Sequence, residues 1–277
     1  MTPDEYCRNQ AAPSGSSFYY SILFLPADKR RALTALFAFY REIEESAREC
    51  SDPALGQIKL NWWRQELATA FSGRAQHPVT QALLPAAARF DLPQELLLLL
   101  IDGVEDGLLK NRHADFRSLQ DYCLRTSGLA EQLAARILGL NDPHALQHVQ
   151  DLGLAFGHTY VVFNVRDDAL RNRILLPQDE LERFGVTAAE ILNLRETENL
   201  KKLIKFAIDK AENCYNRAIS EFSAAERKAQ RTRIALAAIY RSQLREIREG
   251  GCRILRQRVE LTPVRKLWLA WTTWVGG

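Results

Sequence analysis

Apolar residues recur along most of the 277-residue chain at intervals of three and four positions. This spacing places them on one face of an α-helix, and no segment shows the sustained apolar-polar alternation that is typical of a half-buried strand. The pattern therefore predicts an all-α protein. The expected helices cover residues 27–49, 53–72, 78–89, 93–112, 117–139, 143–170, 196–221, 224–249 and 263–275.

The breaks between these helices coincide with residues that stop or start helices. Examples are Ser51-Asp52-Pro53, Asn141-Asp142-Pro143 and Gly250-Gly251, because Pro and Gly interrupt a helix and Asp or Ser favours its first turn. No linker rich in Pro, Gly or Ser divides the chain, and no repeat of fixed period is present. We therefore expect one domain over residues 1–277.

Composition narrows the class of protein. With 37 Lys and Arg against 34 Asp and Glu, the net charge of +3 is too small to predict nucleic-acid binding. No stretch has the roughly 18 uninterrupted apolar residues of a membrane span, and the N-terminus lacks the pattern of a signal peptide. The cysteines are scattered without metal-binding spacing, so we expect reduced thiols in a cytoplasmic protein. They are Cys7, Cys50, Cys123, Cys214 and Cys252.

Two segments combine acidic and basic residues. The first, AFYREIEESAREC, contains Glu42, Glu44, Glu45, Glu49, Arg41 and Arg48. The second, FNVRDDALRNRILLP, contains Asn164, Asp167, Asp168, Arg171 and Arg173. Such runs are usually solvated helix faces with ion pairs four residues apart. Alternatively, carboxylates on two facing helices hold Mg²⁺ against a substrate phosphate.

The order of several segments resembles the squalene/phytoene synthase family, and within it the bacterial presqualene diphosphate synthases. The segments are SGSSFYYSILFLPADKRRALTALFAFYREIEE, WWRQELATA, IDGVEDGL, YCLRTSG, DDALRNRILLPQDELERFGV and RKLWLAW. The resemblance implies an all-helical isoprenoid-synthase bundle around a central cavity. Its members join two farnesyl or geranylgeranyl diphosphates head to head, with Mg²⁺ bound by two DxxxD motifs.

Several site residues follow from this resemblance. Ser17 and Phe18 match the early Ser-Phe of the family, and Arg41 and Arg173 match the arginines beside the two acidic motifs. These four are expected to bind the substrate diphosphate. Tyr240 matches a late helical tyrosine near the diphosphates and is the expected catalytic residue.

The metal ligands of the family are poorly preserved. The first DxxxD falls on Glu44 and Arg48, and the second falls on Asn164 and Asp168. The four side chains carry a formal charge of −1, whereas four aspartates carry −4. Glu44, Asn164 and Asp168 therefore remain as weak ligands, and we expect Mg²⁺ to bind weakly or not at all. Arg48 should pair with a nearby acid, and Glu44 and Asp168 should face each other across the cavity.

Further family positions are altered around the same site. Gly157 and Tyr160 stand where the family has Gln and Asn, and Gly107 stands where it often has Asp. Glu131 replaces a small residue on the helix that lines the prenyl cavity. A carboxylate there costs several kcal/mol unless it is paired or protonated.

Two functions remain open from the sequence. The first is the family reaction, the condensation of two farnesyl diphosphates to presqualene diphosphate or squalene, impaired by the lost carboxylates. The second is a non-catalytic protein on the same fold that binds an isoprenoid or other lipid or assists assembly. In both cases the expected partner is a prenyl diphosphate or another isoprenoid lipid.

Two remaining patterns have a structural and a functional interpretation. His144 and His148 have the spacing of a helical metal pair but no third ligand nearby, so we interpret them as surface residues. The C-terminal segment RKLWLAWTTWV spaces Trp268, Trp271 and Trp274 three residues apart. Core packing is the favoured interpretation. The alternative is peripheral contact with the inner face of the membrane, aided by Arg265 and Lys266.

Overall fold

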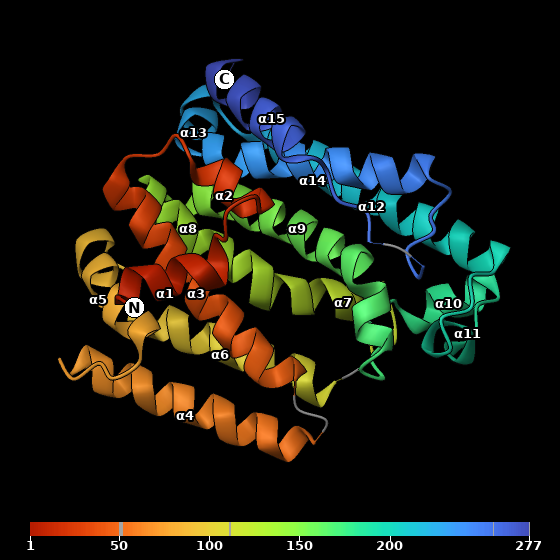
Figure 1. Ribbon diagram of the computed structural model, residues 1–277, viewed down its shortest axis with the longest axis horizontal. Coiled ribbons are helices and arrows are strands. Elements are labelled where there is room, and N and C mark those ends of the chain that lie inside the picture. The colour runs from red at the N-terminus through yellow and green to blue at the C-terminus, as the bar shows by residue number, and fades with distance from the viewer. Residues whose placement is uncertain (50–51, 111, 257, 277) are drawn as a thin grey trace.

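The computed structural model describes residues 1–49, 52–110, 112–256 and 258–276, and all regular elements in these ranges are helices (Figure 1). The first half contains α1 (Pro3–Ala11), α2 (Ser17–Ile22), α3 (Ala27–Arg48), α4 (Pro53–Phe71), α5 (Pro78–Phe90), α6 (Gln94–Leu109), α7 (Phe116–Cys123), the π-helix η1 (Leu124–Gly128) and α8 (Leu129–Leu138). The second half contains α9 (Pro143–Ala169), α10 (Gln178–Phe184), α11 (Ala188–Leu192), α12 (Glu198–Glu221), α13 (Ala224–Ala229), α14 (Arg231–Glu249) and α15 (Pro263–Gly276). The all-α prediction is confirmed.

The long predicted helices agree with the structure, with two subdivisions. The segment predicted at 117–139 is α7, η1 and α8, and the segment predicted at 224–249 is divided into α13 and α14. Cys50, the predicted break at Ser51, and residue 111 of the helix predicted at 93–112 lie outside the described residues.

Four short helices, α1, α2, α10 and α11, were not predicted. Each has nine residues or fewer, which is too short for a clear apolar period. A capping box marks the start of α1. The Thr2 hydroxyl oxygen accepts a hydrogen bond from the Glu5 amide, and the Glu5 carboxylate accepts one from the Thr2 amide. This reciprocal Thr-x-x-Glu pattern marks a helix start.

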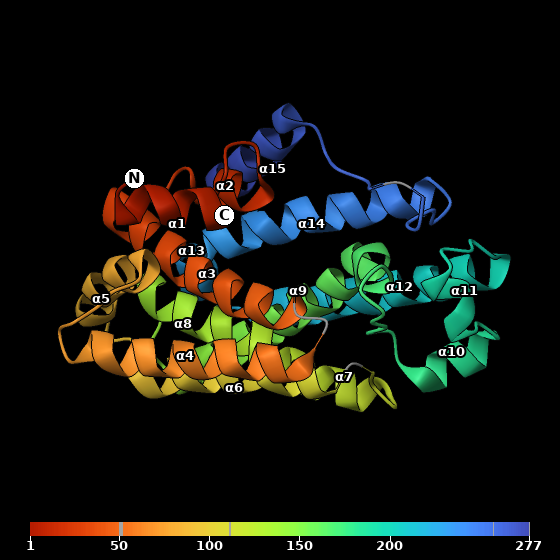
Figure 2. The same cartoon turned by 60° about the horizontal axis from the view of Figure 1, so that its bottom comes forward.

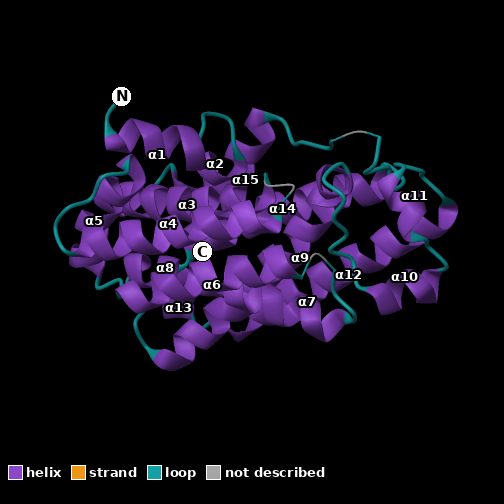
Figure 3. Ribbon diagram, turned by 90° about the horizontal axis from the view of Figure 1, so that it is seen from below, coloured by secondary structure: helices purple, strands orange, loops and turns teal. Residues whose placement is uncertain are grey.

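The helices form layers that are separated most clearly in Figure 2. Helices α4, α6 and α7 form the lowest layer in that view, and α1, α2, α14 and α15 form the uppermost. Helices α3, α8, α9 and α12 lie between them, whereas α10 and α11 extend at one end. The view from below shows only helices and connecting loops in the described part of the chain (Figure 3). A large apolar core extends from Cys7 to Leu255.

None of the described helices is both long and apolar enough to span a membrane.

Close backbone contact holds α9 against η1 at the centre of the bundle. A Cβ atom placed on Gly153 would lie 2.6 Å from the Gly128 Cα atom and 2.8 Å from the Ser127 carbonyl oxygen. Only glycine permits this approach, because nothing in the facing backbone can rotate away. The contact also holds η1 beside the interior of the bundle, and π-helical turns of this kind frequently occur at functional sites.

We predict that Gly153→Ala lowers the free energy of unfolding by about 1–3 kcal/mol, because the added methyl group forces two backbones apart. Urea unfolding followed by circular dichroism measures the change. Gly56→Ala is the matched control, since its Cβ would meet only the flexible end of the Leu108 side chain and alanine favours the helix. Equal destabilisation by the two substitutions would contradict the packing argument.

Candidate functional site

A cavity of about 150 Å³ lies among helices α1, α2, α3, η1, α8, α9 and α14. Aromatic side chains dominate its wall, and a few charged and polar groups interrupt them. The lining residues are Ala11, Phe18, Phe37, Tyr40, Arg41, Glu44, Ser127, Ala130, Glu131, Phe156, Tyr160, Phe163, Arg233, Leu236 and Tyr240. The predicted central cavity is therefore present, and it is small.

Arg41 and Glu44 bring charge to the side of the cavity that α3 forms. Arg41 is exposed, and its Nη1 atom donates to the Gln10 carbonyl oxygen at 2.6 Å. Glu44 is half-buried, and loss of water around it raises the pKa of its carboxyl group, although the neighbouring Arg48 and Arg41 guanidinium groups oppose that increase. Burial thus favours the neutral form of this carboxyl group.

Arg48 forms the expected ion pair, with Asp168 on α9. The Arg48 Nη2 atom lies 3.3 Å from Asp168 Oδ1, and the Arg48 guanidinium carbon lies 5.3 Å from the centre of the Tyr160 ring. Asp168 is only 2% exposed. Burial raises its pKa, while the charges of Arg48 and Arg173 act in the opposite direction. A fixed cation thus occupies the position beside Asp168.

Glu44 and Asp168 do not line the same space. Glu44 lines the central cavity, whereas Asp168 lines a separate small hollow together with Arg173. The expectation that Glu44 and Asp168 face each other across the central cavity is therefore wrong, because only Glu44 lines it. The Arg48 guanidinium group interacts electrostatically with both carboxylates and lies over the Tyr160 ring.

The residues at this site do not fit a magnesium ion. Asn164 donates from its amide nitrogen to the Tyr160 carbonyl oxygen at 2.8 Å and can offer only an uncharged amide oxygen. Asp168 is paired with Arg48 through Oδ1. Within the described ranges, no group of three or more His, Cys, Asp or Glu side chains is arranged to hold a metal ion. Hard cations require several oxygen ligands with net negative charge, and this site lacks such a set.

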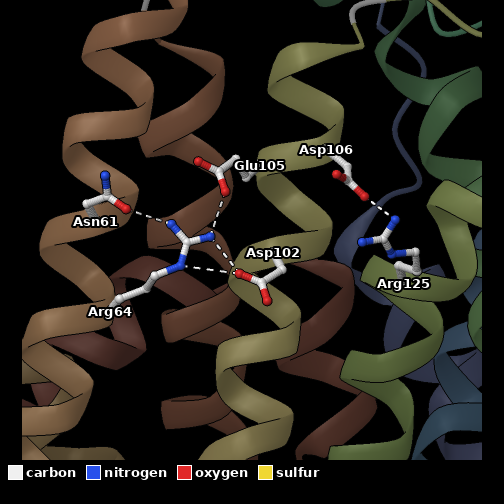
Figure 4. A network of polar contacts seen from close by, with 6 residues as sticks. All are labelled: Asn61, Arg64, Asp102, Glu105, Asp106 and Arg125. Carbon is white, nitrogen blue, oxygen red and sulfur yellow. Dashed lines mark hydrogen bonds and ion pairs between the residues drawn. The ribbon is translucent and has the colours of Figure 1, made fainter.

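The carboxylates of α6 do not replace the missing ligands. Arg64 on α4 donates to Asp102 at 2.6 Å and to Glu105 at 2.7 Å, and Asp106 pairs with Arg125 (Figure 4). These contacts join α4 to α6 and α6 to η1, and none of the six residues in the network lines the central cavity. The acidic groups of α6 therefore serve as ion-pair partners between helices.

The structure brings together only part of the predicted diphosphate site. Phe18, Arg41 and Tyr240 line the central cavity. Arg173 lies in the hollow beside Asp168, and Ser17 is the first residue of α2 and does not line the cavity. Tyr240 packs edge-on against Phe156 and Phe163, and burial raises the pKa of its hydroxyl group, which favours its neutral form.

Glu131 has a partner that sequence reasoning missed. Arg233 on α14 binds both carboxylate oxygens of Glu131, with the Arg233 Nε atom 2.6 Å from Oε2. Glu131 is 2% exposed and Arg233 is 1% exposed. The only available signal was indirect: a carboxylate on a cavity-lining helix requires a cation. The sequence offers 37 lysines and arginines, and choosing among them required the tertiary structure.

Comparison with known proteins identifies the family. The profile of squalene/phytoene synthases matches residues 11–265. The chain belongs to the squalene/phytoene synthase family. The phytoene synthase of Mycobacterium tuberculosis is 31% identical over 261 residues, which covers 92% of this chain and 84% of that protein. The 15-cis-phytoene synthase of Synechococcus elongatus is 26% identical over 275 residues, with 95% and 89% coverage.

Solved structures show the same isoprenoid-synthase fold. A dehydrosqualene synthase crystallised with a ligand superposes with a TM-score of 0.84 and 22% identity, over 98% of this chain and 95% of that chain. Squalene synthase HpnC from Alicyclobacillus acidocaldarius superposes with a TM-score of 0.72 and 24% identity, over 90% and 94%. The helical architecture is thus that of the squalene/phytoene synthase family.

The space beside two altered family positions is filled by neighbouring side chains. A Cβ atom on Gly157 would lie 2.7 Å from the Cys123 Sγ atom, and one on Gly107 would lie 2.4 Å from the Tyr122 ring. The glutamine and aspartate expected at these positions in the family therefore do not fit beside Cys123 and Tyr122. The side chains of Cys123 and Tyr122 pack into the space beside Gly157 and Gly107.

The histidine pair has no metal-binding arrangement. His144 is exposed, and the His148 Nδ1 atom lies 3.1 Å from Glu226 Oε1. The exposure of His144 agrees with its interpretation as a surface residue, whereas His148 is half-buried.

We predict that Arg48→Gln destabilises the protein by about 1–3 kcal/mol, because it leaves the buried Asp168 carboxylate without its cation. Adding Asp168→Asn should recover much of this loss, and urea unfolding of the four combinations measures the coupling. The exposed pair Arg31–Asp4, at 2.7 Å, is the control and should couple by less than about 1 kcal/mol. Equal coupling in both pairs would contradict a special role for Arg48.

Proposed function

We propose that this chain is a ligand-binding member of the squalene/phytoene synthase family in which metal-dependent head-to-head condensation has been lost or severely impaired. The Arg48–Asp168 ion pair is the observation that carries the proposal. In the family reaction, Mg²⁺ would stabilise the departing pyrophosphate. Here a guanidinium group neutralises Asp168 and repels a second cation, so the residues that remain cannot assemble the required charge.

The dimensions of the cavity support the same conclusion. An engineered protein cavity of about 150 Å³ holds one benzene molecule, and ligand pockets for larger molecules are usually about 300–1,000 Å³. Condensation requires two prenyl chains side by side. A cavity of about 150 Å³ suits one short isoprenoid group, with Arg41 at the α3 side of the cavity to attract a phosphate or another anionic end.

The competing function is catalysis of the family reaction with fewer ligands. In that case Glu44, Asn164 and Asp168 would bind Mg²⁺ despite Arg48, and Tyr240 would lie near the reacting diphosphate. The aromatic wall formed by Phe37, Phe156, Phe163 and Tyr240 would suit a carbocation. The same wall would give a ligand-binding descendant affinity for isoprenoids.

We predict no detectable release of pyrophosphate from farnesyl diphosphate in the presence of Mg²⁺, because no metal cluster forms at the site. The Mycobacterium tuberculosis phytoene synthase, assayed with geranylgeranyl diphosphate, is the positive control for the assay. Calorimetry in EDTA should still detect geranyl diphosphate binding, and Arg41→Gln should weaken it about tenfold, equivalent to about 1.4 kcal/mol. Formation of presqualene diphosphate or squalene by the unmodified chain would refute the proposal.

Restoring the acidic motifs should not restore the reaction. We expect the triple variant Glu44→Asp, Arg48→Asp, Asn164→Asp to remain inactive, because the rest of the site has changed with it. Gly157→Gln cannot be added alone, since the Cys123 side chain occupies that space. Cys123→Gly would have to accompany it. Metal-dependent pyrophosphate release by the triple variant would show that ligand loss alone silences the site.

We also propose that α15 contacts the surface of a membrane, at its cytoplasmic face. Trp268 is 60% exposed and Trp271 is 45% exposed, and their rings lie 5.5 Å apart. Val264, Leu267 and Val275 extend the exposed apolar face. Such a face suits the interfacial region of a bilayer, and it would give an isoprenoid-binding protein access to lipid.

Arg265 and Lys266 are not free to attract anionic lipid in the way that the sequence suggested. Lys266 is buried and donates to the Gly15 carbonyl oxygen at 3.0 Å, and Arg265 pairs with Glu246. Trp274 packs against Phe24, with the rings 5.9 Å apart. The favoured core-packing interpretation therefore describes Trp274, while Trp268 and Trp271 leave much of their surface exposed. Membrane contact through α15 would be mainly apolar.

We predict that the double substitution Trp268→Gln, Trp271→Gln weakens binding to phosphatidylcholine vesicles at least tenfold, because the exposed rings supply most of the buried apolar area. Vesicle flotation measures the bound fraction. Trp62→Gln on α4 is the control, since Trp62 is 44% exposed on a different layer. Unchanged binding by the double variant would exclude α15 as the contact.

A further inference from the structure

The inner wall of the cavity contains an unused hydrogen-bond donor. Arg233 engages Glu131 through its Nε and Nη2 atoms, while its Nη1 atom has no hydrogen-bond partner although the residue is 1% exposed. Buried polar atoms without partners are rare, and leaving one unpaired costs about 1–3 kcal/mol. Arg233 lines the central cavity, so this donor lies in the cavity wall, where a shift of the neighbouring rings would expose it to a bound molecule.

Aromatic rings surround the same guanidinium group. Its central carbon lies 4.6 Å from the centre of the Phe37 ring, 5.2 Å from Phe156 and 5.7 Å from Phe18. The rings stabilise the cation but provide no oxygen or nitrogen acceptor for Nη1. A pure hydrocarbon chain in the cavity would not provide one either, and it would leave the donor buried and unsatisfied.

The charge of the group limits the kind of acceptor. Glu131 already neutralises Arg233, so the pair has no net charge, and a second carboxylate would be placed near the first. A neutral oxygen satisfies Nη1 without that repulsion. The cavity volume of about 150 Å³ restricts the bound group to roughly the size of one ring.

We propose that the inner end of the cavity binds a compact, ring-sized group through a neutral carbonyl oxygen that accepts a hydrogen bond from Arg233 Nη1. The inference deepens the proposed ligand-binding function and rests on it. An oxygenated isoprenoid or aromatic group would therefore be preferred at the inner end of the cavity over the unsubstituted hydrocarbon tail of a prenyl diphosphate. Phe37 and Phe156 would enclose its ring, and Arg233 would determine its orientation.

Two probes of nearly equal shape test this proposal. Acetophenone carries a carbonyl group where isopropenylbenzene carries a carbon-carbon double bond. Ligand-observed NMR titration of the full chain should show acetophenone binding at least tenfold more tightly, because only its oxygen satisfies the charged donor. Acetophenone, and not isopropenylbenzene, should also shift the side-chain ¹⁵N resonance of Arg233.

Two variants connect this preference to Arg233. In the double variant Arg233→Met, Glu131→Leu, apolar groups replace the buried pair, which proteins often tolerate, and the preference for acetophenone should disappear. Glu131→Gln retains Arg233 and should retain the preference.

Equal affinity of the unmodified chain for the two probes, binding of neither probe, or an unchanged preference in the double variant would overturn the inference. Geranyl diphosphate binding in EDTA distinguishes failure of the carbonyl site from failure of the proposed isoprenoid binding. If that binding persists while the carbonyl preference is absent, the carbonyl site is refuted and the proposed isoprenoid binding stands. If geranyl diphosphate also fails to bind, the proposed function itself fails.

Discussion

A charge that is buried at the centre of this bundle needs an opposite charge beside it, and the site is organised around that requirement. Arg48 on α3 pairs with Asp168 on α9, and Glu131 on α8 pairs with Arg233 on α14. Each pair joins helices that are distant in sequence. The first pair neutralises a carboxylate in the hollow that Arg173 also lines, and the second makes the aromatic wall of the central cavity locally polar.

Neighbouring side chains fill the space beside two glycines near the candidate site. Tyr122 lies against Gly107, and Cys123 lies against Gly157. In each case a Cβ atom added to the glycine would clash with the neighbouring side chain. The framework nevertheless retains the fold of the squalene/phytoene synthase family, with a TM-score of 0.84 to a dehydrosqualene synthase. Helix packing depends mainly on apolar volume, so a bundle tolerates altered polar residues at its centre if the space is refilled.

Part of the candidate site could be placed from the sequence because its segments resemble those of a known family. Phe18, Arg41, Glu44 and Tyr240 were assigned from family positions, and all four line the cavity. Ser17 and Arg173 were assigned in the same way and lie elsewhere. A position matched to the family specifies the segment of the chain on which a residue lies. The direction of a long side chain such as Arg173 depends on the groups that surround it in the folded protein.

The sequence by itself determined the all-helical class and the long helices, through local periodicity, and the family, through the resemblance of its segments. Only the tertiary structure decided which charges meet. It selected Asp168 as the partner of Arg48, and Arg233 as the partner of Glu131 across 102 positions of sequence. The reason is physical: electrostatic pairing and desolvation depend on distances between helices, and one-dimensional periodicity carries no information about those distances.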